Sequence, residues 1–167
     1  MTSAIYLRRP EAADRAAFLA AVARSRRLHR PWIHAPETAA DFRAYLTKMA
    51  LPSNRAYLVC RADTEEIAGA INLTNMIMGP LRSGFLGYYA FSGHERRGHM
   101  CAGLEAVTRR AFGTLKLHRL EANIQPGNAA SIALVRACGF SKEGYSARYL
   151  KIGGRWRDHE RWAILAY

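Results

Sequence analysis

The sequence lacks the signatures of several common protein classes. It has only three cysteines, Cys60, Cys101 and Cys138, each in an apolar context, so buried thiols are expected rather than a disulfide or a zinc site. No run of about 18 apolar residues is present, which argues against a membrane-spanning helix. Residues 1–9 are too polar and too short for a signal peptide. We therefore expect a soluble, cytoplasmic protein with no membrane contact and no bound metal.

Acidic residues are also scarce, with 13 Asp and Glu against 25 Lys and Arg, and the net charge is +12. Such an excess attracts polyanions, including nucleic acid and phosphate-rich cofactors. The basic residues are spread along the chain, however, and distributed charge is usually an ordinary solvated surface. Weak contact with RNA or the ribosome is therefore a hypothesis only. Retention on RNA that does not weaken with rising salt would contradict it.

The most informative stretch runs from Glu95 to Gly103, after the apolar run 85–91. Apolar residues then recur at helical spacing, at positions 100, 104, 107, 111 and 115, so the pattern predicts a strand, a basic turn and the start of a helix. The free N–H groups and the dipole of a helix start stabilise an anion. Arg96 and Arg97 add charge there, and Gly98 allows close approach to the backbone. We interpret residues 96–103 as a pyrophosphate cradle, although a plain structural cap would share this spacing. The Walker A ending and the three spaced glycines of the dinucleotide fingerprint are both missing.

The remaining periodicities predict an α/β (α+β) fold in one domain, 1–167. Three successive strands without an intervening helix indicate an antiparallel meander. The expected elements are a strand at 5–9, helices at 11–28 and 38–49, strands at 56–60, 67–76 and 83–91, the cradle helix to 115, a strand at 119–125, a helix at 128–138, and a strand pair at 145–152 and 156–165.

The strand at 119–125 alternates strictly between apolar and polar residues. Glu121, Asn123 and Gln125 share its polar face, which is unusual inside a sheet and indicates a wet cleft. Asn128 then suits the N-cap of the following helix, and Ser131 lies one turn further on the same side.

Several motifs in order resemble the GNAT superfamily of acetyl-coenzyme A dependent N-acetyltransferases. They are Pro31-Trp32, the strand 87–89, the cradle, the run 119–122, Asn128-Ala-Ala-Ser131 with Cys138-Gly139-Phe140, and the ending 143–144 with 154–159. The chain looks most like the bacterial branch that acetylates ribosomal-protein N-termini at alanine or serine. Two cradle positions depart from the family pattern, which has Gln or Arg where this chain has Glu95 and Gly or Ala where it has Met100. The resemblance implies a GNAT-like mixed sheet of about seven strands, mostly antiparallel, splayed between the fourth and fifth and flanked by about four helices.

The resemblance also implies acetyl-CoA as cofactor, with its pantetheine arm between the two splayed strands. Backbone donors near Tyr89 and Ala90 would polarise the thioester carbonyl. Asn128 would hold the pantetheine, although it can equally be a pure cap, and Ser131 would give a proton to the thiolate. The implied cofactor-binding residues are Tyr89, Ala90, Phe91, Arg96, Arg97, Gly98, His99, Met100, Cys101, Ala102, Gly103, Asn123, Asn128 and Ser131.

The general base is not placed by a motif. Glu121 is the candidate on the cleft face, but it can equally position Arg119. His34 and His118 are further candidates, because histidine is the side chain that changes charge near neutral pH, but no motif places them. Because an α-amine titrates near pH 7.7–8.0 against about 10.4 for lysine, a strong base is less necessary for an N-terminal acceptor.

The acceptor site is expected around Trp32, His34, Tyr88 and Tyr149, although Trp32 can instead plug the gap between two helices. Three functions remain open on the sequence: acetylation of a protein N-terminus, acetylation of a small amine such as a polyamine, amino acid or antibiotic, and a non-catalytic module that binds coenzyme A or RNA. The protein can be a monomer or a homodimer.

Overall fold

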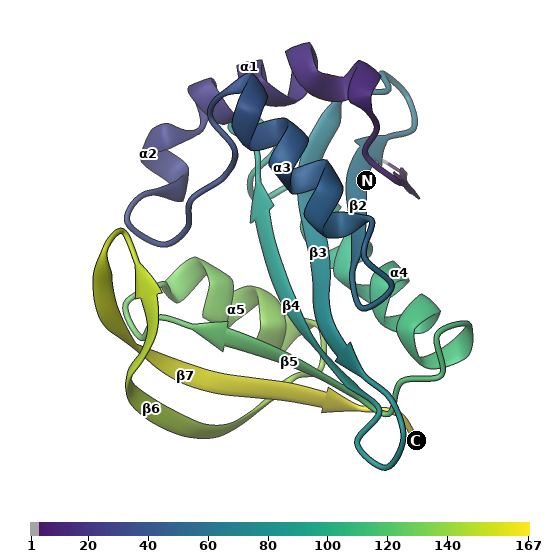
Figure 1. Ribbon diagram of the computed structural model, residues 1–167, viewed down its shortest axis with the longest axis vertical. Coiled ribbons are helices and arrows are strands. Elements are labelled where there is room, and N and C mark those ends of the chain that lie inside the picture. Colours follow the sequence, from purple (N-terminus) through teal and green to yellow (C-terminus); the bar gives the residue numbers. More distant parts are fainter. Residues whose placement is uncertain (1–3) are drawn as a thin grey trace.

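The computed structural model describes residues 4–167, which form one sheet with helices on both faces (Figure 1). The first three residues of the expected domain, and of the stretch tested for a signal peptide, lie outside this range. The strands are β1 (Ile5–Arg8), β2 (Arg55–Arg61), β3 (Ile67–Ile77), β4 (Ser83–Ala90), β5 (Arg119–Ile124), β6 (Ser141–Ile152) and β7 (Arg155–Leu165). They lie in the order β1-β2-β3-β4-β5-β7-β6. The predicted mixed α/β fold is confirmed.

The sheet is antiparallel except between β4 and β5, which are parallel. Their pairing runs only from Ser83 opposite Arg119 to Leu86 opposite Ala122. Beyond it, β4 remains paired with β3 as far as Ala90, while β5 remains paired with β7 as far as Ile124. The two strands therefore diverge, which confirms the predicted splay between the fourth and fifth strands.

The helices cover the sheet unequally. On one face α4 (His99–Gly113) and α5 (Ala129–Ala137) pack over a core that includes Leu104 and Val135. On the other, α1 (Arg15–Arg24) and α3 (Ala39–Met49) cover β2 to β4 through a second core centred on Phe18 and Phe42. Figure 1 shows α3 in front of these strands and α4 behind them, with the β6–β7 hairpin curling towards the loop after α2 (Arg26–His29).

The single helix predicted over 11–28 is wrong in detail. Within residues 4–167 this segment forms a 3-10 turn (Ala12–Asp14), α1 and α2, so that five α-helices replace the expected four or so. The break falls at Ser25, which is fully buried. Its hydroxyl donates to the Ala21 carbonyl at 2.6 Å and accepts from the Ser92 N–H at 2.9 Å. The break between α1 and α2 therefore coincides with a contact to the segment that follows β4. The local spacing of apolar residues carries no information about a contact between such distant segments.

The three cysteines are free thiols, but they are not equally buried. Cys60 lies in the core as predicted. Cys101 on α4 and Cys138 at the end of α5 are only half-buried, and their sulfur atoms are 3.1 Å apart. The expectation of three buried thiols is therefore wrong for two of them, because the sequence does not show that α4 and α5 meet. No helix among residues 4–167 combines the length and apolarity needed to cross a membrane.

Candidate functional site

Two cavities open where β4 and β5 diverge. The larger has a volume of about 890 Å³, which lies in the range of small-molecule and cofactor sites. The smaller has about 70 Å³. Both are lined by the same five residues, which therefore mark their junction: Trp32, Ile33, Tyr88, Asn128 and Ser131.

The larger cavity extends to the start of α4, where the sequence predicted an anion cradle. Gly98 is the N-cap with a φ of 78° and no side-chain cap, so the first-turn N–H groups keep no side-chain partner. Arg96 has a φ of 57° and lines the cavity together with Gly98, His99 and Met100. A turn with left-handed residues ahead of a helix start presents several N–H donors to an anion. These residues therefore fit a pyrophosphate group.

Glu95 also lines this cavity, and its negative charge would oppose a phosphate there. Its carboxylate accepts a hydrogen bond from the Gly93 N–H at 2.6 Å. The side chain thereby stabilises the turn before the cradle. This contact explains how a carboxylate is accommodated at a position where the related pattern has Gln or Arg.

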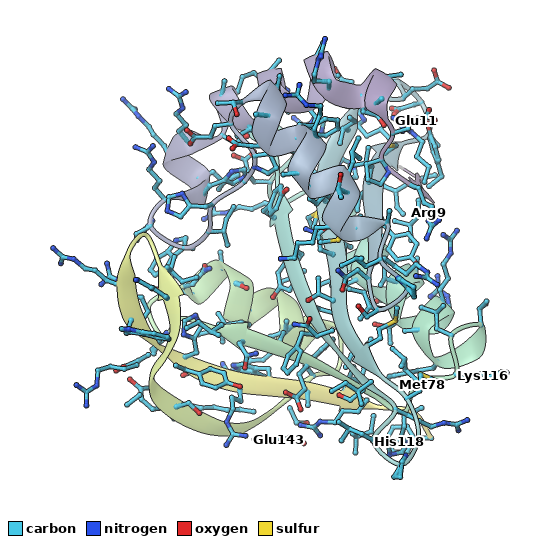
Figure 2. The ribbon with its side chains drawn as sticks, in the orientation of Figure 1. Arg9, Glu11, Met78, Lys116, His118 and Glu143 are labelled. Carbon is cyan, nitrogen blue, oxygen red and sulfur yellow. The ribbon has the colours of Figure 1, made fainter. Side chains whose placement is uncertain are left out.

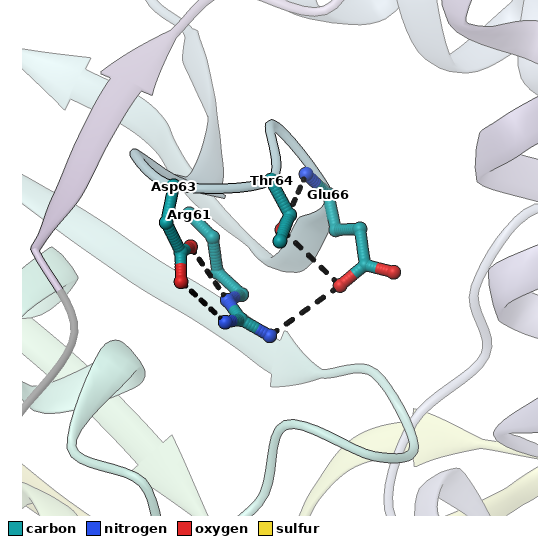
Figure 3. A network of polar contacts seen from close by, with 4 residues as sticks. All are labelled: Arg61, Asp63, Thr64 and Glu66. Atoms are coloured by element: carbon teal, nitrogen blue, oxygen red, sulfur yellow. Dashed lines mark hydrogen bonds and ion pairs between the residues drawn. The ribbon is translucent and has the colours of Figure 1, made fainter.

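Two buried histidines contribute unused polar atoms to the same wall. His99 is 1% exposed and neither of its ring nitrogens has a hydrogen-bond partner, and Nδ1 of His94 also has none. Burial lowers the pKa of His99, and the charges of Arg61 and Arg97 lower it further. Asp63 and Glu66 hold the Arg61 guanidinium in place (Figure 3). Because buried polar atoms normally find partners, these three unpartnered nitrogens are unusual among the residues that line the larger cavity.

Ser131 lies at the junction of the cavities on the first turn of α5. Its hydroxyl is 2.7 Å from the hydroxyl of Tyr88 on β4. Asn128, the N-cap of α5, accepts from the Ser131 N–H at 3.4 Å and so fixes that turn. Burial raises the pKa of Tyr88 far above its usual range. Tyr88 therefore stays protonated and can donate to Ser131, which leaves the serine proton free for a third group.

The end of β4 is held by a residue that the sequence did not single out. His29, at the end of α2, lines the larger cavity, and its Nε2 is 2.8 Å from the Ala90 carbonyl oxygen. The carbonyl can only accept, so Nε2 carries the proton. Burial lowers the pKa of His29, which favours the neutral ring. In the sequence, only its position two residues before Pro31-Trp32 could have indicated that His29 lies at this site.

The smaller cavity contains part of the predicted polar face of β5. Asn123 and Gln125 line it, together with Gly87 from β4 and His159 from β7. The Gln125 amide donates to the Trp32 carbonyl at 3.3 Å. Asn123 Oδ1 is buried without a hydrogen-bond partner. His159 lies within the 154–159 motif, but sequence reasoning gave it no role.

Several predicted site residues line neither of these two cavities. Phe91 is fully buried against Phe18, with ring centroids 5.5 Å apart. Gly103 faces the sheet, where an added Cβ would stand 2.8 Å from Val59 Cγ2, so it serves helix packing. The others that line neither cavity are Arg97, Ala102, Glu121, His34 and Tyr149.

Glu121 belongs to an ion-pair cluster near the start of β5. Its Oε1 accepts from Arg119 Nε at 2.7 Å, and the same guanidinium also binds Glu143. Glu143 lies on β6, low on the molecule in the view of Figure 2. This arrangement matches the alternative interpretation, in which Glu121 positions Arg119.

Comparison with known proteins identifies relatives that match more than half of this chain. The family described as an acetyltransferase (GNAT) domain matches residues 4–141. The chain is 38% identical over 104 residues to the probable N-acetyltransferase YjcK of Bacillus subtilis, covering 62% of this chain and 58% of that protein. It is 39% identical over 97 residues to the [ribosomal protein uS5]-alanine N-acetyltransferase of Escherichia coli, covering 58% and 50%. The chain thus spans only about half to three fifths of the length of these two relatives.

A solved structure extends the likeness to the full fold. The Mycobacterium smegmatis RimJ in complex with CoA-disulfide superposes with a TM-score of 0.91 at 26% identity, covering 99% of this chain and 83% of that one.

Proposed function

We propose, given that this chain belongs to the GNAT acetyltransferase family, that it transfers an acetyl group from acetyl-CoA to the N-terminal α-amine of a protein. A ribosomal protein is the acceptor class that the name of the Escherichia coli relative supports. The observation that carries the proposal is the junction at Ser131, where a cofactor-sized cavity meets a small one that can admit an amine.

The larger cavity fits the acetyl donor. The pyrophosphate of coenzyme A would lie at the start of α4, held by backbone N–H groups at Gly98 and His99 and by the Arg96 charge. The pantetheine arm would then run along β4 towards Asn128. Acetyl-CoA supplies an activated thioester, whose carbonyl carbon accepts the amine.

Ser131 is the proton donor that the geometry supports for the departing thiolate. When Tyr88 is the donor in its hydrogen bond with Ser131, the serine proton can point into the junction. A positioned acid of this kind is effective because an unprotonated thiolate would otherwise reverse the reaction. The catalytic role of Asn128 is to hold the helix turn that carries Ser131.

The smaller cavity favours an α-amine over a polyamine. Its lining residues include no aspartate or glutamate. In the larger cavity the one carboxylate, that of Glu95, is bonded to the Gly93 N–H. A polyamine carries several positive charges and would need carboxylates to offset its desolvation. A peptide N-terminus carries one charge and can lose it near neutral pH.

A three-acceptor comparison tests this assignment. Thiol release from acetyl-CoA would be measured with a peptide bearing a free N-terminus and a small first residue, with the same peptide blocked at its N-terminus, and with spermidine. We expect kcat/KM for the free peptide to exceed that for spermidine at least about tenfold, a difference of about 1.4 kcal/mol. Faster turnover of spermidine than of the free peptide would indicate that the acceptor is a small amine. Binding of coenzyme A without turnover of any acceptor would contradict the proposed acetyl transfer.

A further inference from the structure

His159 is the only titratable side chain among those that line the smaller cavity, apart from the Tyr88 hydroxyl at the junction. It lies on β7 opposite Ser146 of β6 and is 3% exposed. The ring of Tyr149 meets it edge-on, with centroids 6.3 Å apart. A buried imidazole that faces a cavity beside the proposed acid is placed for proton transfer.

The hydrogen bond on the other side of the ring determines which nitrogen is free. Nδ1 of His159 is 2.9 Å from the carbonyl oxygen of Arg157. A carbonyl can only accept, so Nδ1 carries the proton in the neutral ring and Nε2 keeps its lone pair. Nε2 has no hydrogen bond to any of residues 4–167 that the structure describes. The backbone thus fixes the tautomer that can accept a proton.

A second acceptor in the same cavity also lacks a donor. Asn123 Oδ1 on β5 is buried and has no hydrogen-bond partner. The side-chain amide of Gln125, two residues further along the chain, already donates to the Trp32 carbonyl. An amine supplies N–H donors, so it would satisfy both Asn123 Oδ1 and His159 Nε2. The volume of about 70 Å³ admits the nitrogen and its nearest carbon atoms. These two atoms therefore point to an amine ligand rather than an anion.

We propose that the smaller cavity seats the acceptor nitrogen and that His159 Nε2 removes its proton, an assignment that rests on the proposed acetyl transfer. The ammonium group of the acceptor gives H⁺ to Nε2 and becomes a neutral amine, while the ring becomes an imidazolium. The amine nitrogen then forms the C–N bond as the C–S bond breaks and its electron pair goes to sulfur. The second amine proton replaces the one that Ser131 gives to the thiolate. The imidazolium finally releases its proton to solvent.

Neighbouring carboxylates do not offer the same chemistry. Asp158, the residue before His159, accepts hydrogen bonds from the Tyr145 hydroxyl and from the Arg148 N–H, which together lower its pKa. Glu121 is bound to Arg119 and lines neither cavity. Within the lining of the smaller cavity, His159 is therefore the base that remains.

The variant His159→Asn separates a base from a structural residue. The Asn amide nitrogen takes the place of Nδ1 and can still donate to the Arg157 carbonyl, but no proton acceptor remains at Nε2. We expect kcat with the free peptide to fall about 100-fold, with KM for acetyl-CoA unchanged. The matched control is His118→Asn, because His118 is exposed and lines neither cavity; Figure 2 shows it at the lower end of the molecule. This control should keep the wild-type rate.

A weakly basic acceptor distinguishes proton removal from positioning. A peptide analogue with an aminooxy group in place of its α-amine is already neutral, so His159→Asn should slow it less than about threefold. Equal losses for both acceptors would overturn the inference and leave the proposed function intact. An unchanged rate of His159→Asn with the ordinary peptide would also overturn the inference and leave the proposed function intact. Wild-type protein that releases no thiol with either acceptor would overturn both proposals. If the asparagine variant does not fold, as judged by its melting curve, His159→Gln is used in its place. The same changes in kcat and in KM for acetyl-CoA are then expected.

Discussion

Replacing Ser131 with alanine is expected to lower kcat about 100-fold, with KM for acetyl-CoA changed less than about twofold. The change removes one oxygen at the junction of the two cavities, where Ser131 is 2.7 Å from the Tyr88 hydroxyl. It leaves the cradle at the start of α4 untouched. An effect on kcat alone is what the loss of a proton donor produces, because the donor acts only as the C–S bond breaks. Steady-state kinetics of thiol release provide both parameters.

Ser141→Ala is the matched control for this variant. Ser141 is exposed at the start of β6, so its removal deletes the same hydroxyl far from the junction. We expect its kinetics to match those of the wild type. An equally active Ser131→Ala protein would remove the serine from the mechanism, and a large rise in KM for acetyl-CoA would make it a binding residue.

Replacing Leu104 with alanine is expected to lower the free energy of unfolding by about 3 kcal/mol, within the range of about 2–5 for buried leucines. Leu104 is fully buried on α4, in the core between that helix and the sheet. The loss arises from the burial given up and from the cavity left behind. Urea unfolding followed by circular dichroism measures it. Leu51→Ala is the control, because Leu51 is 51% exposed and should cost less than about 0.5 kcal/mol.

The same variant tests whether the cradle helix holds the cofactor. Coenzyme A that binds only the folded state should restore about 2.7 kcal/mol at 100 times its Kd. The gain should be equal in wild type and in Leu104→Ala, since Leu104 does not line the cavity. Coenzyme A that leaves both unfolding curves unchanged would contradict a cofactor site at α4.

The features predicted well from sequence are those encoded within a few residues. The three- and four-residue spacing from Met100 to Ala111 predicted α4, and strict alternation over Leu120, Ala122 and Ile124 predicted β5. Asn128 was predicted as the N-cap of α5, and its side chain makes that hydrogen bond. Such signals are local because backbone hydrogen bonding and one buried face determine them.

The features that sequence did not reveal depend on contacts between distant segments. Ser25 ends α1 while bonded to Ser92, and His29 is bonded to the end of β4. His159 reaches the small cavity only because β7 inserts between β5 and β6 in the sheet. The related-family pattern singled out Ser131, which lies at the junction of the two cavities. It could not distinguish Gly103, which packs on Val59, from the glycine of the cradle.

The central claim is acetyl transfer from acetyl-CoA to an N-terminal α-amine, and product analysis tests it most directly. The wild-type protein would be incubated with acetyl-CoA and a peptide that carries both a free α-amine and a lysine. Tandem mass spectrometry would then locate the added acetyl group. We predict one acetyl group, on the α-amine, with a matching amount of free thiol. Acetylation confined to the lysine, or no acetylated product while coenzyme A binds, would contradict the account.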